Sequence, residues 1–222
     1  MHTPTSRVPS RSPRPRVRHQ RDGSPPSRPG AAGLVALACV LVGCAGEDAG
    51  PAGWSPLEAA ELTAPQQAQE TTALEARDAM FAELLATLTA ELETSGPVGA
   101  IAVCKTEAPR IAAAVGERFG VRMGRTSDRL RNPGNAGPEW AAALLADRPE
   151  EPRLVSSPAG ELGLTSPIRV AGKCLLCHGP EESLGDELRE ALARHYPDDA
   201  ATGYSAGDLR GWFWVEVPAS VQ

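Results

Sequence analysis

The sequence predicts one α+β domain, from about Gln66 to Gln222, in which an antiparallel sheet has helices before and around it. Two observations predict this class. Apolar side chains recur at helical spacing early in the region, and short runs typical of strands come late. Aromatic residues make up only 4% of the chain, so we expect a core of Leu, Ala and Val. Such a core leaves space that a bulky apolar cofactor would fill.

The early part of this region predicts three helices. A long amphipathic helix is predicted over 66–93, and Ser95-Gly96-Pro97 ends it. The Ala-rich stretch Val98–Gly120 predicts two short helices, and Pro109 opens the second, where a missing N–H costs nothing. The apolar face of the long helix consists of Leu74, Phe81, Leu84, Leu85, Leu88 and Leu92.

The later part predicts mainly strands. Residues Arg153–Val170 predict two strands around a Pro-Ala-Gly turn. Residues Leu209–Pro218 predict a last strand with three apolar side chains on one face, and these are Phe213, Val215 and Val217. The other predicted elements are a strand at Val121–Thr126, a helix at about Pro138–Ala146, and a helix within Glu182–Tyr196 that Pro197 stops.

Residues 1–43 have the features of a secretory signal peptide. The first 30 residues carry seven arginines and one acid, and Ala31–Gly43 is a run of 13 apolar or small residues, too short to span a bilayer. The run ends in Leu-Val-Gly-Cys, which resembles the bacterial lipobox. We therefore expect lipidation of Cys44 and anchoring to the bacterial cell envelope, on its periplasmic or extracellular face.

Residues 44–65 are rich in Gly, Ala, Pro and acid, and they predict a flexible linker between the anchor and the domain. Without residues 1–43 the chain loses seven of its 22 basic and one of its 28 acidic residues, which leaves a net charge of −12. This acidic balance argues against a nucleic acid partner. No segment after residue 43 is apolar enough to cross a membrane.

The motif CLLCHG, at residues 174–179, carries the clearest chemical signal in the sequence. Two thiols at this spacing can meet the two vinyl groups on one edge of a porphyrin, and the histidine that follows can turn back under the iron. The motif predicts covalent attachment of one haem c through Cys174 and Cys177, with His178 as the proximal iron ligand. Export agrees with this prediction, because haem c is attached outside the bacterial cytoplasm.

Zinc binding and a reversible disulfide are the alternatives. A closed zinc site has four ligands, so Cys174 and Cys177 would have to recruit Cys104 and a histidine, since the sequence has no second C-x-x-C pair. A thioredoxin-like C-x-x-C precedes a long helix, whereas Gly179-Pro180 interrupts any helix here. A zinc-binding or thiol-redox structural protein is therefore the alternative function.

The second axial position of the iron has four candidate ligands. Cys104 is the one cysteine left without another assigned role. His195 supplies an imidazole, although a cation at a helix C-terminus also suits the helix dipole. Met80 and Met123 are equally consistent with a place in the core and in a loop.

Four ordered stretches of the sequence resemble the signatures of one family, the PAS-like c-type haem domain, which is found alone or as the periplasmic sensor part of signalling proteins. They are AIAVCKTEAPRIA, RTSDRLRNPGN, PIRVAGKCLLCHG and YPDDAATGYSAGDLRGWFWVEV, and the resemblance covers about Phe81–Val217. It implies a PAS-like sheet with a long N-terminal helix and flanking helices. It also implies that His178 and Cys104, the cysteine of the AI-x-V-C motif, hold the iron. A thiolate ligand favours ferric iron and a low reduction potential.

Four arginines stand close together in an otherwise acidic chain, and they are Arg122, Arg125, Arg129 and Arg131. Arginine pairs well with carboxylates, so Arg125 and Arg131 are candidates to bind the haem propionates. A solvated basic loop is the alternative.

Two functions follow from a single haem with both axial positions filled. Such a haem has no open site for a substrate, which argues against an enzyme. The protein is then a membrane-tethered electron carrier for a periplasmic redox partner, or a redox or gas sensor that acts on a signalling partner. In the sensor, loss of Cys104 from the iron would change the shape of the domain.

Overall fold

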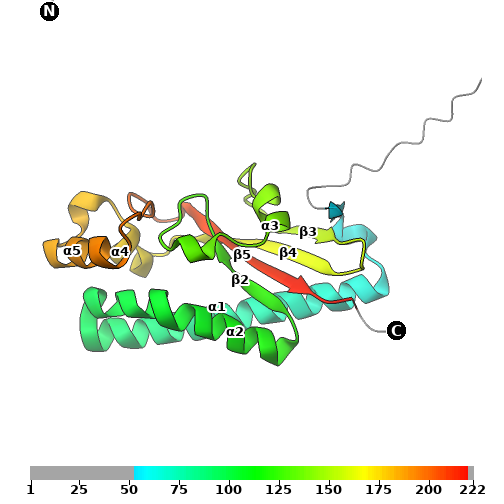
Figure 1. The fold of residues 1–222 in the computed structure, drawn as a ribbon, viewed down its shortest axis with the longest axis horizontal. Coiled ribbons are helices and arrows are strands. Elements are labelled where there is room, and N and C mark those ends of the chain that lie inside the picture. The colour runs from blue at the N-terminus through cyan, green and yellow to red at the C-terminus, as the bar shows by residue number, and fades with distance from the viewer. Residues whose placement is uncertain (1–52, 220–222) are drawn as a thin grey trace, which may run out of the picture. The chain divides into compact units, whose positions relative to one another are not determined.

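A five-stranded antiparallel sheet forms the centre of the fold (Figure 1). The structure is a computed structural model, and it describes residues 53–219. The strand order is β1-β3-β4-β5-β2. The strands are β1 (Ser55–Leu57), β2 (Arg122–Thr126), β3 (Arg153–Ser156), β4 (Leu162–Arg169) and β5 (Leu209–Val217). The α+β class and each of the four strands predicted from the sequence are confirmed.

Two helices cover one face of the sheet (Figure 1). Helix α1 spans Ala64–Ala102 and is kinked at Gly96, whose φ of 66° is in the left-handed region that suits glycine. The break confirms the predicted end of the long helix, and the helical segment after Pro97 falls within the stretch 98–120 where two short helices were predicted. A π-helical segment, η3 (Val103–Glu107), then leads into α2 (Ala108–Phe119), which Pro109 opens as predicted.

Shorter helical elements complete the fold. Helix α5 confirms the helix predicted before Pro197, and α3 is a shorter form of the one predicted at about 138–146. These α-helices are α3 (Glu139–Leu144), α4 (Leu175–His178) and α5 (Asp186–His195). The 3-10 segments are η2 (Ala59–Glu61), η4 (Pro133–Asn135), η5 (Gly172–Cys174) and η6 (Glu181–Ser183).

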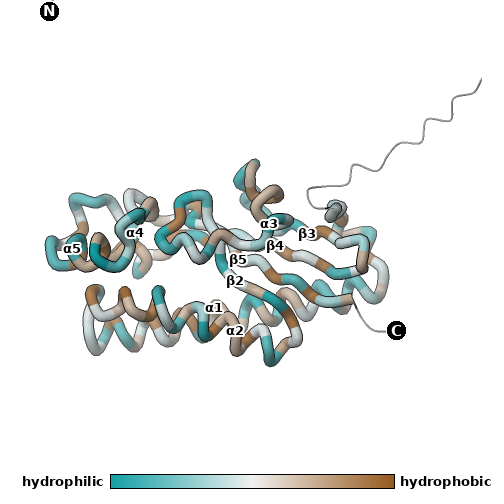
Figure 2. Tube along the Cα trace, in the orientation of Figure 1, coloured by the Kyte–Doolittle hydropathy of each residue, from teal (hydrophilic) through white to brown (hydrophobic). Residues whose placement is uncertain are grey.

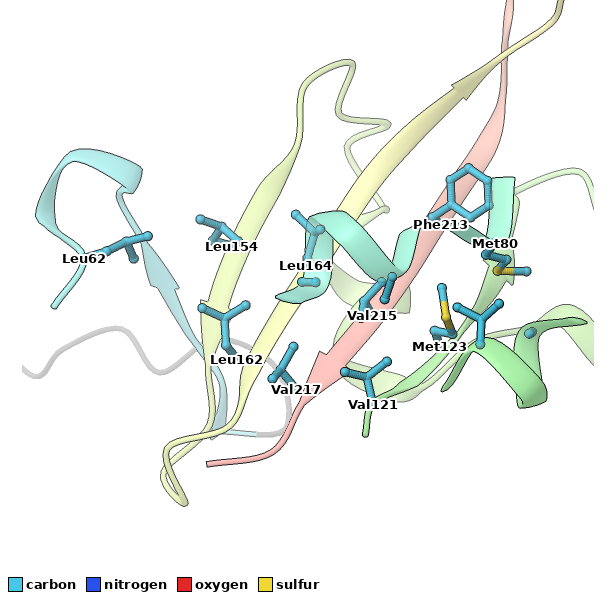
Figure 3. Packing of buried hydrophobic residues seen from close by; sticks show 14 residues of the cluster. Leu62, Met80, Val121, Met123, Leu154, Leu162, Leu164, Phe213, Val215 and Val217 are labelled. Atoms are coloured by element: carbon cyan, nitrogen blue, oxygen red, sulfur yellow. The ribbon is translucent and has the colours of Figure 1, made fainter. Parts of the chain in front are cut away.

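The main core lies between the sheet and the helices α1 and α2 (Figure 3). Small side chains on α1, Ala73 and Ala76, are fully buried and allow the helix to lie close to the strands. The sheet contributes Leu162, Leu164, Phe213, Val215 and Val217 to this core, together with Met123 of β2 and Met80 of α1. The prediction that β5 turns its three apolar side chains to one face is therefore confirmed.

The opposite face of the sheet is covered by a tryptophan cluster. Trp140 of α3 stacks on Trp54, with 5.0 Å between ring centroids, and Trp214 of β5 packs against them. The indole Nε1 of Trp140 donates a 3.0 Å hydrogen bond to the buried carboxylate of Glu216, which also pairs with Arg122 at 2.7 Å. These contacts give a buried carboxylate two donors.

The folded domain begins earlier than the sequence predicted. Strand β1 pairs with β3, with Pro56 opposite Val155, and Trp54 just before it is only 8% exposed. The part of the predicted linker from residue 53 onwards therefore belongs to the domain. The backbone of β1 is hydrogen-bonded to β3, and the indole of Trp54 packs in the tryptophan cluster. The predicted signal peptide at 1–43, Cys44, and linker residues 44–52 lie outside the described residues. Between residues 53 and 219, no helix combines the length and apolar character needed to cross a bilayer.

Candidate functional site

A cavity of about 170 Å³ lies where α1, one end of the sheet and the C-x-x-C-H motif meet. Helix α1 lines it with Phe81, Leu84, Leu85, Leu88 and Leu92, the apolar face predicted from the sequence. Figure 2 shows hydrophobic residues along the part of α1 that lies opposite α4 and α5. Phe81 is 48% exposed and Leu85 is 40% exposed. Large apolar side chains left open beside a cavity indicate that a bulky apolar group covers them.

The C-x-x-C-H motif forms a single helical turn at the edge of this cavity. Cys174 ends η5, and Cys177 and His178 belong to α4. All three side chains line the cavity, and both thiols are free. Gly179 ends the turn, and a Cβ at this position would lie 2.6 Å from the carbonyl oxygen of Leu175. The turn therefore requires glycine directly after the histidine.

The imidazole of His178 is held in one tautomer. Its Nδ1 lies 2.7 Å from the carbonyl oxygen of Ala201, and because a carbonyl only accepts, Nδ1 carries the proton. The lone pair is then on Nε2, the nitrogen available to a metal. Burial, helped by the charges of Arg131 and Arg210, lowers the pKa of His178 to about 3. The ring therefore stays neutral, as a metal ligand must.

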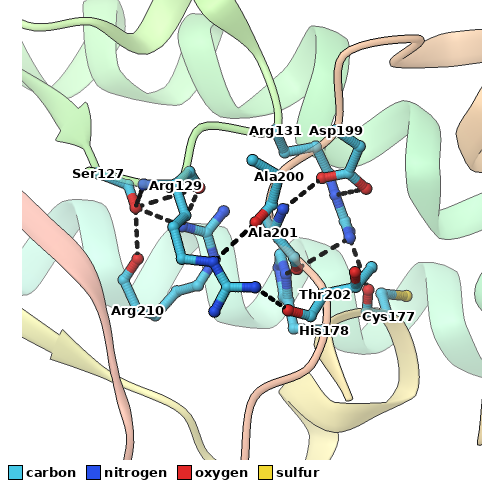
Figure 4. A network of polar contacts seen from close by, with 10 residues as sticks. All are labelled: Ser127, Arg129, Arg131, Cys177, His178, Asp199, Ala200, Ala201, Thr202 and Arg210. Atoms are coloured by element: carbon cyan, nitrogen blue, oxygen red, sulfur yellow. Dashed lines mark hydrogen bonds and ion pairs between the residues drawn. The ribbon is translucent and has the colours of Figure 1, made fainter. Parts of the chain in front are cut away.

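Arg131 holds the histidine turn in place (Figure 4). Its Nη2 donates to the carbonyl oxygens of Cys177, at 2.7 Å, and Ala201, at 3.2 Å, while its Nε pairs with Asp199 at 2.9 Å. The other carboxylate oxygen of Asp199 accepts a 2.8 Å hydrogen bond from the backbone N–H of Ala201. Arg131 thus has a structural role that the sequence did not predict, and its predicted role as a propionate ligand stays a prediction.

Loop 199–204 is tied to the motif along its backbone. Gly203 N–H donates to the carbonyl of Gly179 at 2.8 Å, and Tyr204 N–H to that of His178 at 2.9 Å. Arg129 donates to the carbonyls of Ala200, at 2.9 Å, and Thr202. This loop lies within the last of the four stretches that resemble the family, but the sequence analysis gave no role to its residues, the histidine's acceptor included. A local signal was the aspartate two residues before Ala201, the spacing of an Asx turn.

Arg210 is a second residue that the sequence analysis missed. It lines the cavity, and its Nη1 donates to Ser127 Oγ at 2.9 Å. Its guanidinium lies 5.5 Å from the ring centroid of Tyr204. The guanidinium of Arg129 lies 4.3 Å from the same centroid. Among residues 53–219, Arg210 Nε and Tyr204 Oη are buried without a hydrogen-bond partner. Burial lowers the pKa of Arg210.

Cys104 reaches the same cavity from the π-helical segment η3. An extra residue in a helical turn changes the direction of the side chains around it, and π-turns are frequent at functional sites. The sequence predicted only ordinary short helices here. Burial raises the pKa of the Cys177 thiol, and the electrostatic influence of Cys104 on Cys177 acts in the same direction. The predicted pair of candidate axial ligands, Cys104 and His178, therefore lines one cavity.

Arg125 lines the cavity from the sheet. It stands opposite Phe213 in the β2–β5 ladder, and the ring of Phe213 meets that of Phe81 on α1 edge-on at 6.1 Å. Arg125 thus lies on the helix-covered side of the sheet. Within the described part of the chain, its guanidinium has no hydrogen bond or ion pair. Burial lowers the pKa of Arg125. The electrostatic effects of Cys104 and Tyr196 act in the opposite direction but are smaller.

The other candidate axial ligands lie elsewhere. His195, the alternative to Cys104, is exposed in the last turn of α5 and does not line the cavity. The buried face of α5 carries Leu188, Ala191 and Leu192, but His195 is the last residue of the helix and is exposed beyond that packing. Met80 and Met123 are both buried in the main core and also do not line the cavity.

Two features of the structure bear on the alternatives to haem attachment. The Cys174–Cys177 pair stands on a helical turn that ends at His178, and no long helix follows as in a thioredoxin-like site. In the part of the chain that the structure describes, no three or more His, Cys, Asp or Glu residues come together as a metal-binding group.

Comparisons with known proteins agree with the fold and with the resemblance found in the four sequence stretches. A solved structure, the crystal structure of the cyanobacterial haem-protein Tll0287, matches with a TM-score of 0.50 and 26% sequence identity. The match covers 72% of this chain and 99% of that chain. No curated protein matches this chain. The model of the Tll0287-like family matches residues 58–218, and the chain therefore belongs to the Tll0287-like family.

Proposed function

We propose that this protein binds one haem c covalently, through Cys174 and Cys177, with His178 as an iron ligand. The observation that carries the proposal is the neutral His178 with its Nδ1–H held by Ala201, on the same helical turn as two free thiols. The apolar wall of α1 and the buried Arg210 Nε without a partner in residues 53–219 also fit a large apolar group with carboxylates. The haem-protein Tll0287 supports the choice of cofactor.

The protein's own residues have three tasks in this proposal. Ala201, Arg131 and Asp199 orient the imidazole and the turn that carries it. Helix α1 supplies an apolar surface that excludes water. Cys104 is proposed as the second axial ligand, because it lines the cavity together with His178 while His195 and the two methionines do not. Bound haem would supply a one-electron redox centre.

Electron transfer is the role that we propose first, with no enzymatic activity. Leu176, between the two cysteines, is 47% exposed and offers an apolar contact for a redox partner beside the attachment turn. Redox or gas sensing is the second role, and it rests on Cys104 as a ligand that ferrous iron would hold weakly. We further propose that the protein is a lipoprotein of the bacterial cell envelope, because residues 1–44 combine a basic region, an apolar run and a lipobox-like end.

Covalent attachment can be tested by expressing the full chain with haem c maturation machinery. We expect the purified protein to keep one haem through acid denaturation and to gain the mass of one haem. Cys174→Ala and Cys177→Ala should each remove one thioether, and the double variant should release all haem on denaturation. A wild-type protein that releases its haem, or binds none, would contradict the proposal.

The two roles can be separated by the behaviour of the reduced protein. A carrier keeps both axial ligands in both oxidation states, so its absorption spectrum should be unchanged by CO. A sensor that loses Cys104 on reduction should bind CO with a large spectral shift. A redox titration on the same sample gives the potential, which we expect to be low if the thiolate binds ferric iron.

A further inference from the structure

The guanidinium of Arg125 and the phenol of Tyr196 both line the cavity, and neither makes a hydrogen bond to another described residue. The other three arginines that line the cavity each have a partner. Arg131 is bound to Asp199, Arg169 pairs with Glu150, and Arg210 donates to Ser127. Arg125 and Tyr196 are therefore free to bind something that enters the cavity.

The fold brings both donors to the side of the cavity that carries Cys104. Tyr196 follows the last residue of α5 and is only 4% exposed. The ammonium of Lys105 lies 5.9 Å from the centroid of its ring, and Lys105 directly follows Cys104 in η3. Arg125 enters from the sheet on the face that points to α1, opposite Phe213. Three elements distant in sequence thus surround one corner of the cavity.

The charges in this corner favour an anion. Burial raises the pKa of Tyr196 to about 12, so its hydroxyl stays protonated and can donate. Arg125 lines the cavity as a partly buried cation. Two carboxylates in the described residues pair with cavity-lining arginines, Asp199 with Arg131 and Glu150 with Arg169, and neither is bonded to Arg125. A partly buried cation without an acid partner is stabilised by an anionic ligand.

We propose that Arg125 and Tyr196 form an anion-binding site beside Cys104, which takes a carboxylate or a small inorganic anion. This inference rests on the proposed function, because the cavity would hold haem. The anion has two possible sources with the same chemistry. It is either a propionate of the haem or a free anion that takes the place of Cys104 at the iron. In both cases the ligand accepts hydrogen bonds from a guanidinium and a phenol.

Ligand titrations of the haem-loaded full chain test the free anion. In a Cys104→Ala background, cyanide binds ferric haem as an anion, whereas CO binds ferrous haem as a neutral molecule. We expect Arg125→Gln and Tyr196→Phe each to weaken cyanide binding by about tenfold to a hundredfold, the range for a hydrogen bond to a charged group. CO affinity should stay within about twofold. Arg118→Gln, an exposed arginine of α2 paired with Glu83, is the control and should change neither affinity.

A second titration tests the propionate. The full chain with Cys174→Ala and Cys177→Ala binds haem without attachment, and it can be compared with haem dimethyl ester, which lacks the carboxylates. If a propionate occupies the site, Arg125→Gln should weaken haem binding about tenfold and leave binding of the ester unchanged. Arg125→Lys keeps the charge and should restore part of the lost haem affinity. This variant keeps the test informative if Arg125→Gln folds poorly.

The outcomes are distinct. A loss in the cyanide titration assigns the site to a free anion, and a loss in the haem titration alone assigns it to a propionate. Unchanged affinities in both titrations would overturn the anion site while leaving the haem proposal intact. A wild-type protein without haem would overturn the proposed function, and this inference with it.

Discussion

The Nδ1 atom of His178 lies 2.7 Å from the carbonyl oxygen of Ala201, and this contact decides which ring nitrogen can bind a metal. The same carbonyl accepts a 3.2 Å hydrogen bond from Arg131. Since the acceptor is backbone and is held by a second donor, the imidazole is oriented before any metal arrives. Preorganised ligands of this kind lose less freedom on binding.

Burial of His178 in its neutral form should make the stability of the haem-free protein depend on pH. The pKa of His178 is lowered from 6.5 to about 3, so between these values the unfolded chain binds a proton that the folded chain does not. The free energy of unfolding should therefore fall as pH drops from about 6.5 towards 3. His178→Gln removes this titration, so its urea unfolding should depend less on pH over that window. Parallel curves for the two proteins would show that the histidine is not buried neutral.

The buried ion pair between Arg131 and Asp199 predicts a large loss on truncation. Their side chains are 8% and 11% exposed, so Arg131→Met should leave Asp199 charged and unpaired. We expect a loss of about 3–5 kcal/mol in the free energy of unfolding of the haem-free protein. Adding Asp199→Leu to this variant should recover part of it.

The surface pair Arg118–Glu83 is the matched control for this experiment. Both side chains are about half exposed, so Arg118→Met should cost less than about 1 kcal/mol. If the two arginine variants unfold alike in urea, the Arg131–Asp199 pair does not hold the histidine turn.

Local patterns predicted most of the fold. The spacing of Leu84, Leu88 and their neighbours identified α1, and alternation along β5 identified the core face of the sheet. The edge strand β1 was missed because three residues are too few for a periodic pattern. Its stability comes from pairing with β3 and from the stacking of Trp54 on Trp140, contacts between residues far apart in sequence.

The candidate site was predictable only in part. The attachment motif is contiguous, so its chemistry could be inferred from six residues. The acceptor of the His178 proton is a backbone carbonyl, which any residue type supplies, and no sequence pattern marks it. The ion pair of Arg131 was missed for a related reason, because its partner Asp199 lies 68 positions away in the chain.

The early start of the domain can be tested by shortening the chain. Trp54 is 8% exposed and stacks on Trp140, so Trp54→Ala should destabilise the domain by about 3–5 kcal/mol in urea unfolding. A chain that begins at Gln66 should lose at least as much, since it also lacks β1. Full stability of the shortened chain would restore the flexible linker predicted from the sequence.

The remaining axial-ligand candidates give a negative prediction with two readouts. His195→Gln should leave the absorption spectrum of the haem-loaded protein and its stability unchanged, because His195 is exposed. Met80→Ala should leave the position of the Soret band unchanged yet lower stability by about 2–5 kcal/mol, since Met80 is 1% exposed in the core. A change of spin state in either variant would assign it to the iron instead of Cys104.

The central claim is that one covalent haem lies between His178 and Cys104. Its most direct test is the absorption spectrum, with the pyridine haemochrome, of wild-type protein beside Cys104→Ala, both matured as haem c proteins. We predict a c-type haemochrome for both, and a thiolate-ligated low-spin spectrum for the wild type that the Cys104→Ala variant loses. A spectrum indifferent to the substitution would remove Cys104 from the iron, and the absence of a c-type haemochrome would contradict the account as a whole.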